Sequence, residues 1–286
     1  MGQLIAGQLL NGAIVGTLYG IVALGVTLTF GITGIVNFAL GVFMMLGAYA
    51  AWYFTEVAGM PYPLAVVAAV AFTSAAGLVA DQALFRFTRN NLVNGLLVSI
   101  GMIAVLESIA LLYFTSTPKE LHRVLPGVFS VAGIVLPKIK VLVFALLLAA
   151  ILGTYAALTR TWVGRAAYAY AQNPEAAALM GVPIARLQSG VVVYSTALAG
   201  LGGALYASLY SLEPTLGSLF ILKAVEAAIL AGIGSVTGAL IGGMILGITE
   251  GIGSIYLPLA FRDVYGLVFL VAILLFKPSG LFAGRR

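Results

Sequence analysis

Thiols and imidazoles are almost missing from this 286-residue chain, which contains no cysteine and one histidine, His122. The absence of cysteine excludes disulfides, thiolate metal sites and cysteine nucleophiles. A single histidine excludes bis-histidine haem ligation and histidine metal clusters, which argues against an electron-transfer subunit. Charge is also scarce, because 8% of the residues are charged and 62% are hydrophobic. A soluble domain carries about 25% charged residues, so the composition predicts an all-α polytopic membrane protein.

Long apolar stretches divide the chain into nine candidate transmembrane helices, since a bilayer core about 30 Å thick needs about 20 apolar residues per helix. They cover residues 7–30, 35–54, 63–85, 93–114, 141–158, 189–210, 219–235, 238–256 and 264–277. The seventh is short and ends in AGIGS, so eight full spans with one re-entrant or broken helix stay open. We expect one transmembrane domain over residues 1–286. The N-terminus lacks the basic region of a signal peptide, so the first span is expected to be retained.

Lysine and arginine are distributed unequally between the two sets of connecting loops. One set holds Arg86, Arg89, Arg160, Arg165, Arg186, Lys277, Arg285 and Arg286; the other holds Lys119, Arg123, Lys138, Lys140 and Arg262, mostly within loop 115–140. Because positive residues favour the cytoplasmic side, the first set is predicted to be inside, with the N-terminus outside and the C-terminus cytoplasmic. In the external loop, residues 127–137 have two β-branched runs around Ala132 and Gly133. They favour a small β-hairpin and an irregular cap equally.

Glycines recur at a spacing of four residues in three stripes. They are Gly12, Gly16 and Gly20, then Gly234, Gly238 and Gly242, and finally Gly243, Gly247 and Gly251. Small residues four apart share one helix face and let backbones approach closely, so the stripes predict tight packing within one subunit or between subunits. The glycine-rich segment 232–243 lacks the lysine of a phosphate-binding loop. The chain is therefore expected to hydrolyse no ATP itself, and we predict no catalytic residue, metal site or cofactor in it.

A few charged side chains fall inside the predicted spans, where each costs about 2.5–3.5 kcal/mol at a helix centre and needs a partner or a wet cavity. They are Glu107, Lys223, Glu226 and Glu250, with Asp81 near one end of a span. Lys223 and Glu226 stand three residues apart and can neutralise each other, as a structural pair or beside a pathway. Glu107 and Glu250 lack a partner nearby in the sequence. Each is expected to bond within the bundle or to line a path.

An isolated amide, Asn37, lies between apolar neighbours in GITGIVNFALG (31–41). The glycines of this segment indicate a bend between the first two spans. An amide at such a bend can satisfy broken backbone, or it can hydrogen-bond a passing solute.

The segment AQNPEAAALMGVP (171–183) is polar and carries the signals of a short helix at both ends. Asn173 suits the N-cap, Pro174 the first helical position and Glu175 the positive end of the helix dipole. Gly181 is placed to stop the helix, and Pro183 prevents its continuation. About two turns, or roughly 10 Å, are too short to span a membrane. The segment lies in loop 159–188 and is either a plain connection or a contact for another subunit.

Four stretches together resemble the branched-chain amino acid permease family of ABC importers, on the LivH side of the LivH/LivM pair. They are YGIVALGVTLTFGITGIVNFALGVFMMLGAYAA (19–51), RTWVGRAAYAYAQNPEAAALMGVPIARL (160–187), PTLGSLFILKAVEAAILAGIGSVTGALIGGMILG (214–247) and FKPSGLF (276–282). The resemblance covers essentially the whole chain. Leu40 and Val42 depart from it, because the family commonly has His and Glu there. The solute is therefore open, since similar permeases also carry urea, short amides and carboxylates.

The resemblance implies a membrane subunit without chemistry of its own in a bacterial inner membrane. Its partners would be a second permease (LivM-like or a second copy), two cytosolic ATPase subunits that bind ATP and Mg²⁺, and a periplasmic or lipid-anchored solute-binding protein. Within segment 160–187, the coupling residues would be Asn173, Pro174, Glu175, Ala176, Ala177 and Gly181. The candidate path residues would be Asn37, Phe38, Lys223 and Glu226. No nucleic acid is expected.

The alternative is a self-sufficient channel or ion-coupled carrier that uses Glu107 and Glu250 as proton or cation sites. It would transport without an ATPase and would leave the 173–181 helix without a role.

Overall fold

The structure, a computed structural model, describes residues 2–34, 37–89, 91–122, 126–131, 134–232, 234–256, 262–278 and 280–282. The helices are α1 (Gly2–Leu28), α2 (Leu40–Trp52), α3 (Tyr62–Ala83), α4 (Leu92–Phe114), α5 (Lys138–Arg160), α6 (Trp162–Gln172), α7 (Pro174–Leu179), α8 (Ile184–Tyr206), α9 (Leu216–Ala231), α10 (Val236–Tyr256) and α11 (Arg262–Phe276). Helices α1 and α2 continue into π-helical turns, η1 (Thr29–Thr33) and η2 (Tyr53–Val57), and the 3-10 turn η3 (Phe85–Phe87) follows α3.

Each of the nine predicted apolar stretches contains a helix, so the all-α polytopic class is confirmed. Within the described residues, seven helices are long and apolar enough to cross a membrane. Helices α9 and α11 are shorter, at 16 and 15 residues. Sixteen residues rise about 24 Å, less than a bilayer core of about 30 Å. Helix α9 ends at Ala231, before the glycine-rich segment, which agrees with the partial-span alternative.

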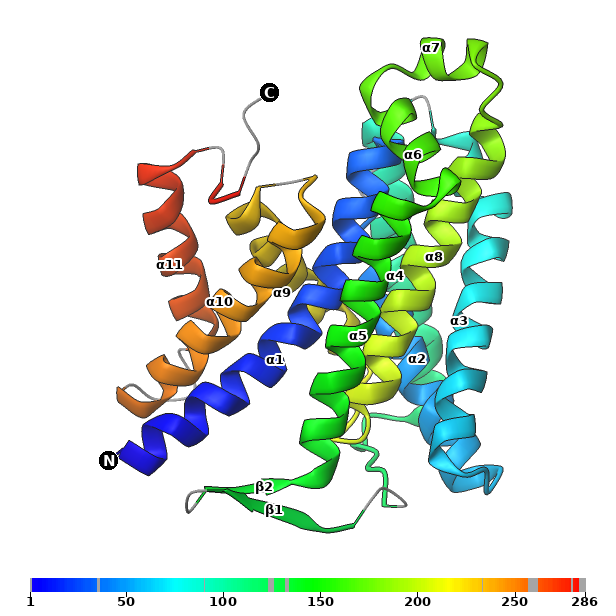
Figure 1. Ribbon diagram of the computed structural model, residues 1–286. Coiled ribbons are helices and arrows are strands. Elements are labelled where there is room, and N and C mark those ends of the chain that lie inside the picture. Colours follow the sequence, from blue (N-terminus) through cyan, green and yellow to red (C-terminus); the bar gives the residue numbers. More distant parts are fainter. Residues whose placement is uncertain are drawn as a thin grey trace.

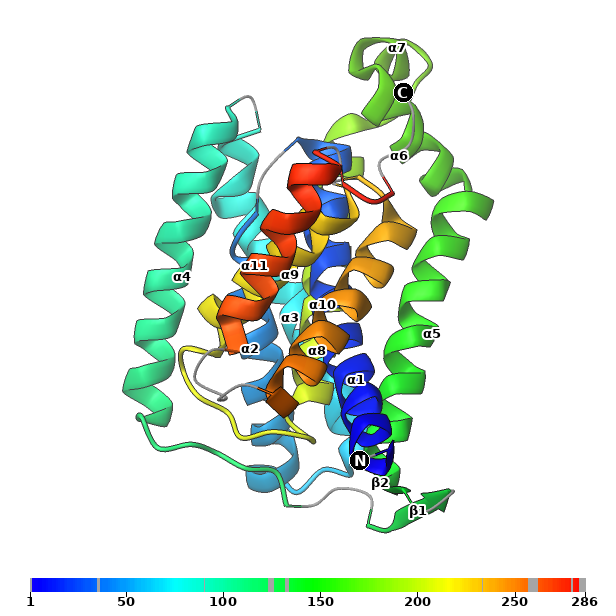
Figure 2. The same ribbon diagram turned by 90° about the vertical axis from the view of Figure 1, so that its left-hand side faces the viewer.

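Helix α1 runs through the centre of the bundle (Figure 1) and is almost wholly buried from Gly12 to its end at Leu28. It packs most extensively on α10, while α8 packs on both α2 and α3. Helices α4 and α5 flank this core on opposite sides (Figure 2) and expose most of their apolar surface. Because lipid is as apolar as these side chains, such exposure is compatible with a membrane or with a neighbouring subunit.

The first and third glycine stripes face one another where α1 crosses α10. A β-carbon at Gly12 would lie 2.6 Å from the carbonyl oxygen of Gly247, and one at Gly16 would lie 2.7 Å from that of Gly243. A β-carbon at Gly251 would lie 2.8 Å from the carbonyl oxygen of Gln8. Real side chains essentially never approach so closely. The two backbones therefore touch directly, and these glycines pack inside one chain.

The two long connections lie at opposite ends of the bundle. A hairpin of β1 (Val128–Val131) and β2 (Ile134–Pro137) lies at the same end as the N-terminus, while α6 and α7 lie at the other (Figures 1 and 2). The strands pair antiparallel, with Val128 opposite Pro137 and Val131 opposite Ile134. Of the two alternatives left open, the paired strands bear out the hairpin, although Ala132 and Gly133 lie outside the described residues.

Candidate functional site

Helix α7 is capped at both ends by its own sequence. The Asn173 side chain accepts a hydrogen bond of 3.0 Å from the amide of Ala176, and Pro174 occupies the first helical position. At the other end Gly181 has φ +81° and donates its amide to Ala178, while Val182 donates to the carbonyl of Ala177. Such bonds satisfy the carbonyls that a helix leaves unpaired at its end. The six-residue helix therefore has defined ends.

Two large apolar side chains protrude from the end of α7. Leu179 is 89% exposed and Met180 is 85% exposed, whereas Ala177 is buried against the rest of the chain. Glu175 and Ala176 are exposed beside them. Helix α7 forms the tip of the bundle (Figure 1), away from most of the apolar helices. Two neighbouring exposed apolar side chains at such a tip are a candidate contact for another protein. Leu179 and Met180 were not among the predicted contact residues, although two large apolar side chains in a polar segment could have indicated them.

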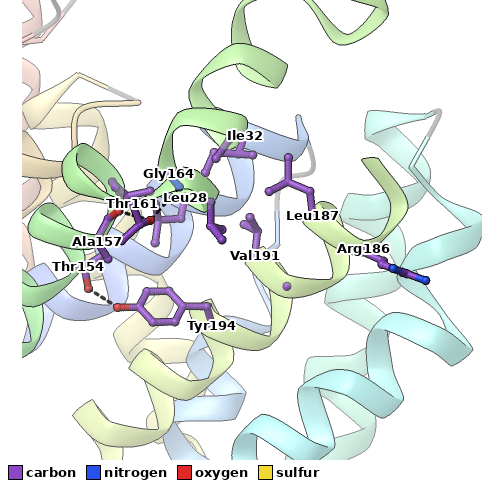
Figure 3. A pocket seen from close by; sticks show the side chains of 14 residues that line it. Leu28, Ile32, Thr154, Ala157, Thr161, Gly164, Arg186, Leu187, Val191 and Tyr194 are labelled. Carbon is purple, nitrogen blue, oxygen red and sulfur yellow. Dashed lines mark hydrogen bonds between the residues drawn. The ribbon is translucent and has the colours of Figure 1, made fainter. Parts of the chain in front are cut away.

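Helix α6, which the sequence analysis treated as loop, supports α7. Thr161 caps it by accepting from the amide of Gly164 at 3.2 Å. A β-carbon at Gly164 would lie 2.1 Å from the carbonyl oxygen of Leu158, so this glycine lets α6 fold back onto the end of α5. An apolar cavity of about 270 Å³ lies between α5, α6, α8 and the end of α1. Figure 3 shows Leu28, Ile32 and Val191 gathered around it.

Lys223 lies in a buried charged cluster formed by α1, α9 and α10. Its Nζ is 2.9 Å from Oε1 of Glu250 and 3.4 Å from Oε2 of Glu226. Tyr19 donates its hydroxyl to the other carboxylate oxygen of Glu250 at 2.9 Å. The expected pair with Glu226 is therefore incomplete, because the nearer carboxylate comes from another helix. A lone charge in hydrocarbon is costly, and this arrangement places one cation between two carboxylates.

A polar cavity of about 220 Å³ adjoins this cluster between α1, α5 and α10. Its lining includes Gln8, Asn11, Lys140, Glu250 and Ser254. Lys140 donates to the side-chain oxygen of Asn11 at 2.7 Å. Because these groups can offer hydrogen bonds to a polar solute, the cavity and the cluster form one polar region in an apolar bundle. Asn11 and Lys140 were not among the predicted site residues, because they are distant in the sequence from the charges on α9 and α10.

Glu107 has a local structural partner. Its carboxylate accepts a hydrogen bond of 3.0 Å from the backbone amide of Ser218 in the first turn of α9. A carboxylate at this position satisfies an unpaired amide and opposes the positive end of the helix dipole. Glu107 was expected either to bond within the bundle or to line a path. The structure shows the bond within the bundle.

Asn37 and Phe38 lie just before α2, at the bend between the first two spans. The Asn37 side chain is 1% exposed, and its oxygen accepts from the amide of Ala39 at 3.0 Å. The amide nitrogen of Asn37 is buried and finds no hydrogen-bond partner among the described residues. Phe38 packs on the hydrophobic core. Asn37 thus stabilises the broken backbone, which is the first of its two expected roles, and contact with a solute stays a prediction.

The structure brings some of the predicted residues together and keeps others apart. Lys223 and Glu226 share one cluster, whereas Asn37 and Phe38 lie on another element, just before α2. The six predicted coupling residues form one continuous element at the tip of the bundle, as Figure 2 also shows.

The matches that cover nearly the whole chain agree in one assignment. The family described as "Branched-chain amino acid transport system / permease component" matches residues 8–276. The chain is 32% identical to the high-affinity branched-chain amino acid transport system permease protein BraD of Pseudomonas aeruginosa, over 96% of this chain and 94% of the relative. It is 29% identical to LivH of Escherichia coli, with the same coverage. A probable LivH of Methanocaldococcus jannaschii is 31% identical, over 96% of this chain and 91% of that protein.

No solved structure matches the chain. The family match and the relatives nevertheless cover nearly its full length. This multi-pass membrane protein belongs to the family of branched-chain amino acid transport system permease components.

Proposed function

We propose that this chain is one of two membrane-spanning permease subunits of an ATP-driven importer for a small polar solute. The observation that carries the proposal is α7, a helix with defined ends that presents Leu179 and Met180 at the tip of the bundle. An exposed apolar pair on a defined helix suits docking to a cytosolic ATPase subunit. The named relatives are permease proteins of branched-chain amino acid transport systems, which supports the same role.

The other components follow from this role. Two ATPase subunits would bind ATP and Mg²⁺ and hydrolyse ATP, and this chain would do no chemistry itself. A second permease, either LivM-like or another copy of this chain, would complete the path, and a periplasmic or lipid-anchored binding protein would deliver the solute. The arrangement requires a bacterial inner membrane with α7 and the C-terminus cytoplasmic and the hairpin and N-terminus outside. The greater number of positive loop residues on the α7 side supports this orientation.

The proposed path runs through the polar region around Glu250. The cavity beside Asn11 and Lys140 would receive the solute from the hairpin end, and the Lys223 cluster would follow it deeper in the bundle. Ionisable groups at this depth are expensive unless they face one another or a wet cavity, and here the Lys223 and Glu250 side chains face one another. Asn37, with its available amide donors, is a second candidate contact. A branched-chain amino acid, a short amide or a carboxylate would suit such groups.

The test is a mild-detergent pull-down from the native membrane, followed by identification of the co-purified proteins by mass. The intact chain is compared with Leu179→Glu, Met180→Glu, which places charge on the docking pair. Val128→Glu, Phe129→Glu is the matched control, because these two side chains are exposed and apolar at the opposite end. We expect a P-loop ATPase with the intact chain and the control and little with the α7 variant.

Substitutions within α7 test coupling separately from docking. Glu175→Arg, or bulky residues at Ala176 and Ala177, should uncouple ATP hydrolysis from uptake while the membrane helices stay folded. Normal uptake in these variants would contradict the coupling role. If no ATPase accompanies the intact, folded chain, the self-sufficient carrier becomes the better hypothesis, and Glu250 becomes the first residue to mutate.

A further inference from the structure

We propose that Asp81, Arg89 and Ser189 form a mechanical link that makes α3 follow α8 when α7 is displaced. The inference rests on the proposed function, because it assumes that an ATPase moves α7. It goes beyond that function by naming the helix that receives the movement and the residues that transmit it.

The link is a buried ion pair with a serine built into it. Nη2 of Arg89 lies 2.9 and 2.8 Å from the two carboxylate oxygens of Asp81 and 2.9 Å from Oγ of Ser189. The Ser189 hydroxyl in turn donates to Asp81. The side chain of Asp81 is 1% exposed and that of Arg89 15%. Charged hydrogen bonds that are shielded from water are the strong ones, so the three side chains hold one fixed geometry.

The three residues join elements that are distant in the sequence. Asp81 is on the last turn of α3, Arg89 is in the connection from α3 to α4, and Ser189 is near the start of α8. Nη1 of Arg89 also reaches the carbonyl of Ala185 at 3.5 Å, in the first turn of α8. Helix α7 ends only a few residues before α8 begins. The link therefore binds the start of α8, which is the part of α8 that a displacement of α7 would move first.

Tight packing continues the attachment of α3 to α8 along both helices. A β-carbon at Gly77 would lie 2.8 Å from Cβ of Thr196, and one at Gly200 would lie 2.7 Å from Cβ of Thr73. Each threonine thus occupies the space that a glycine on the other helix leaves open. Interlocked contacts of this kind resist sliding, because close-packed interiors have few low-energy alternatives. Helices α3 and α8 are consequently expected to move as one body.

The opposite side of α8 is different, because the apolar cavity of about 270 Å³ separates it from α5 and α6. Figure 3 shows Thr154 and Tyr194 joined by a hydrogen bond at one side of this cavity, and their hydroxyls are 2.7 Å apart. Arg186 points away from it in the same view. A cavity offers few contacts that resist displacement. A push on α7 should therefore change the separation of α8 from α5 and leave its separation from α3 unchanged.

The chain is naturally free of cysteine, so introduced thiols are its only labelling sites. Spin labels on Arg186→Cys with Val79→Cys report the distance between α8 and α3, and labels on Arg186→Cys with Leu152→Cys report that between α8 and α5. Val79 and Leu152 are exposed apolar residues on the halves of α3 and α5 nearer to Arg186. Both distances are measured in the assembled complex with its ATPase, before and after trapping with ATP and vanadate. Uptake per ATP hydrolysed is measured on the same variants, with radiolabelled leucine as the probe.

In the native background we expect the α8–α5 distance to change by about 2 Å or more, the scale of helix shifts in switching proteins, while the α8–α3 distance stays constant. Asp81→Asn or Arg89→Gln should make the α8–α3 distance change with ATP and lower uptake per ATP at least tenfold. Ser189→Ala, which leaves the ion pair, should have a weaker effect of the same kind. Tyr194→Phe is the matched control, because it removes a hydrogen bond from the other side of α8 and should leave the α8–α3 distance constant.

An unchanged α8–α3 distance and normal uptake per ATP in the Asp81 and Arg89 variants would overturn the link alone. If those variants fail to fold, Ser189→Ala is the test: a changed α8–α3 distance with lowered uptake per ATP supports the link, and an unchanged distance with normal uptake per ATP overturns it. A native complex that shows no ATP-dependent change in either distance and contains no ATPase would overturn the proposed function, and the link with it.

Discussion

Replacing Lys223 by methionine tests how the buried charges of α9 and α10 are balanced. Lys223 lies 2.9 Å from Glu250 and 3.4 Å from Glu226. With an effective dielectric constant of about 20, these separations correspond to gross attractions of about 6 and about 5 kcal/mol, which are too similar to rank the partners. Burial ranks them, because the Glu250 side chain is 0% exposed and that of Glu226 is 15% exposed.

Lys223→Met should therefore lower the free energy of unfolding by about 3–5 kcal/mol, mainly because it leaves the Glu250 carboxylate without its cation. Adding Glu250→Gln removes that charge and should restore most of the loss, since the amide still accepts from Tyr19. Adding Glu226→Gln instead should restore less. Methionine and glutamine nearly preserve side-chain volume, so cavities do not confound the comparison. The assay is thermal unfolding of the purified variants in detergent, followed by helical circular dichroism.

Equal rescue by the two double variants would refute the reasoning, because it would show that Glu226 and Glu250 share the lysine equally. Uptake adds a second measurement. If the Lys223→Met, Glu250→Gln protein regains stability but not uptake, the cluster serves the path as well as the fold. If both return together, the cluster is structural.

Two further predictions concern backbone contact and the helix cap. Gly247→Ala should destabilise the fold by about 1–3 kcal/mol, because its β-carbon would lie 2.3 Å from the carbonyl oxygen of Gly12 and would force α1 and α10 apart. Gly101→Ala, whose β-carbon meets nothing within 4 Å, is the control and should be neutral or slightly stabilising in the same unfolding assay. Asn173→Ala should cost α7 about 1 kcal/mol and weaken ATPase binding about fivefold in a pull-down titration, whereas Asn173→Ser should bind normally. A stable Gly247→Ala protein, or full binding by Asn173→Ala, would contradict the respective argument.

Much of the fold could be predicted because apolar length alone identifies a membrane helix. The nine helical stretches and the caps of α7 follow from local residue types, whereas α9 ends at Ala231, four residues before the predicted end of its span. Helix α6 could not be found in this way. Its stability depends on the contact of Gly164 with Leu158 at the end of α5, and that contact becomes visible only when the chain has folded back.

The candidate site was harder to predict, because its bonds join residues that are far apart in the sequence. The hydroxyl of Tyr19 reaches Glu250 across a sequence separation of 231 residues, and Glu107 reaches Ser218 across 111. Local spacing identified Lys223 and Glu226 as a pair and therefore named the more distant of two partners. Residue spacing along one helix can predict ion pairs only within that helix. A buried cation pairs with the nearest carboxylates, and these can come from another helix.

The bundle combines tightly packed helix pairs with two cavities that lie beside α5. Helix α1 touches α10 through facing glycines, and α3 interlocks with α8 through threonines that fill the space beside glycines, so neither pair has room to slide. Both the apolar cavity beside α6 and the polar cavity beside Lys140 border α5. The polar cavity lies on the proposed solute path, and the apolar cavity lies beneath the proposed ATPase contact. Because loosely packed boundaries are where a rigid bundle can rearrange, α5 is the helix across which a movement of α7 would alter the path.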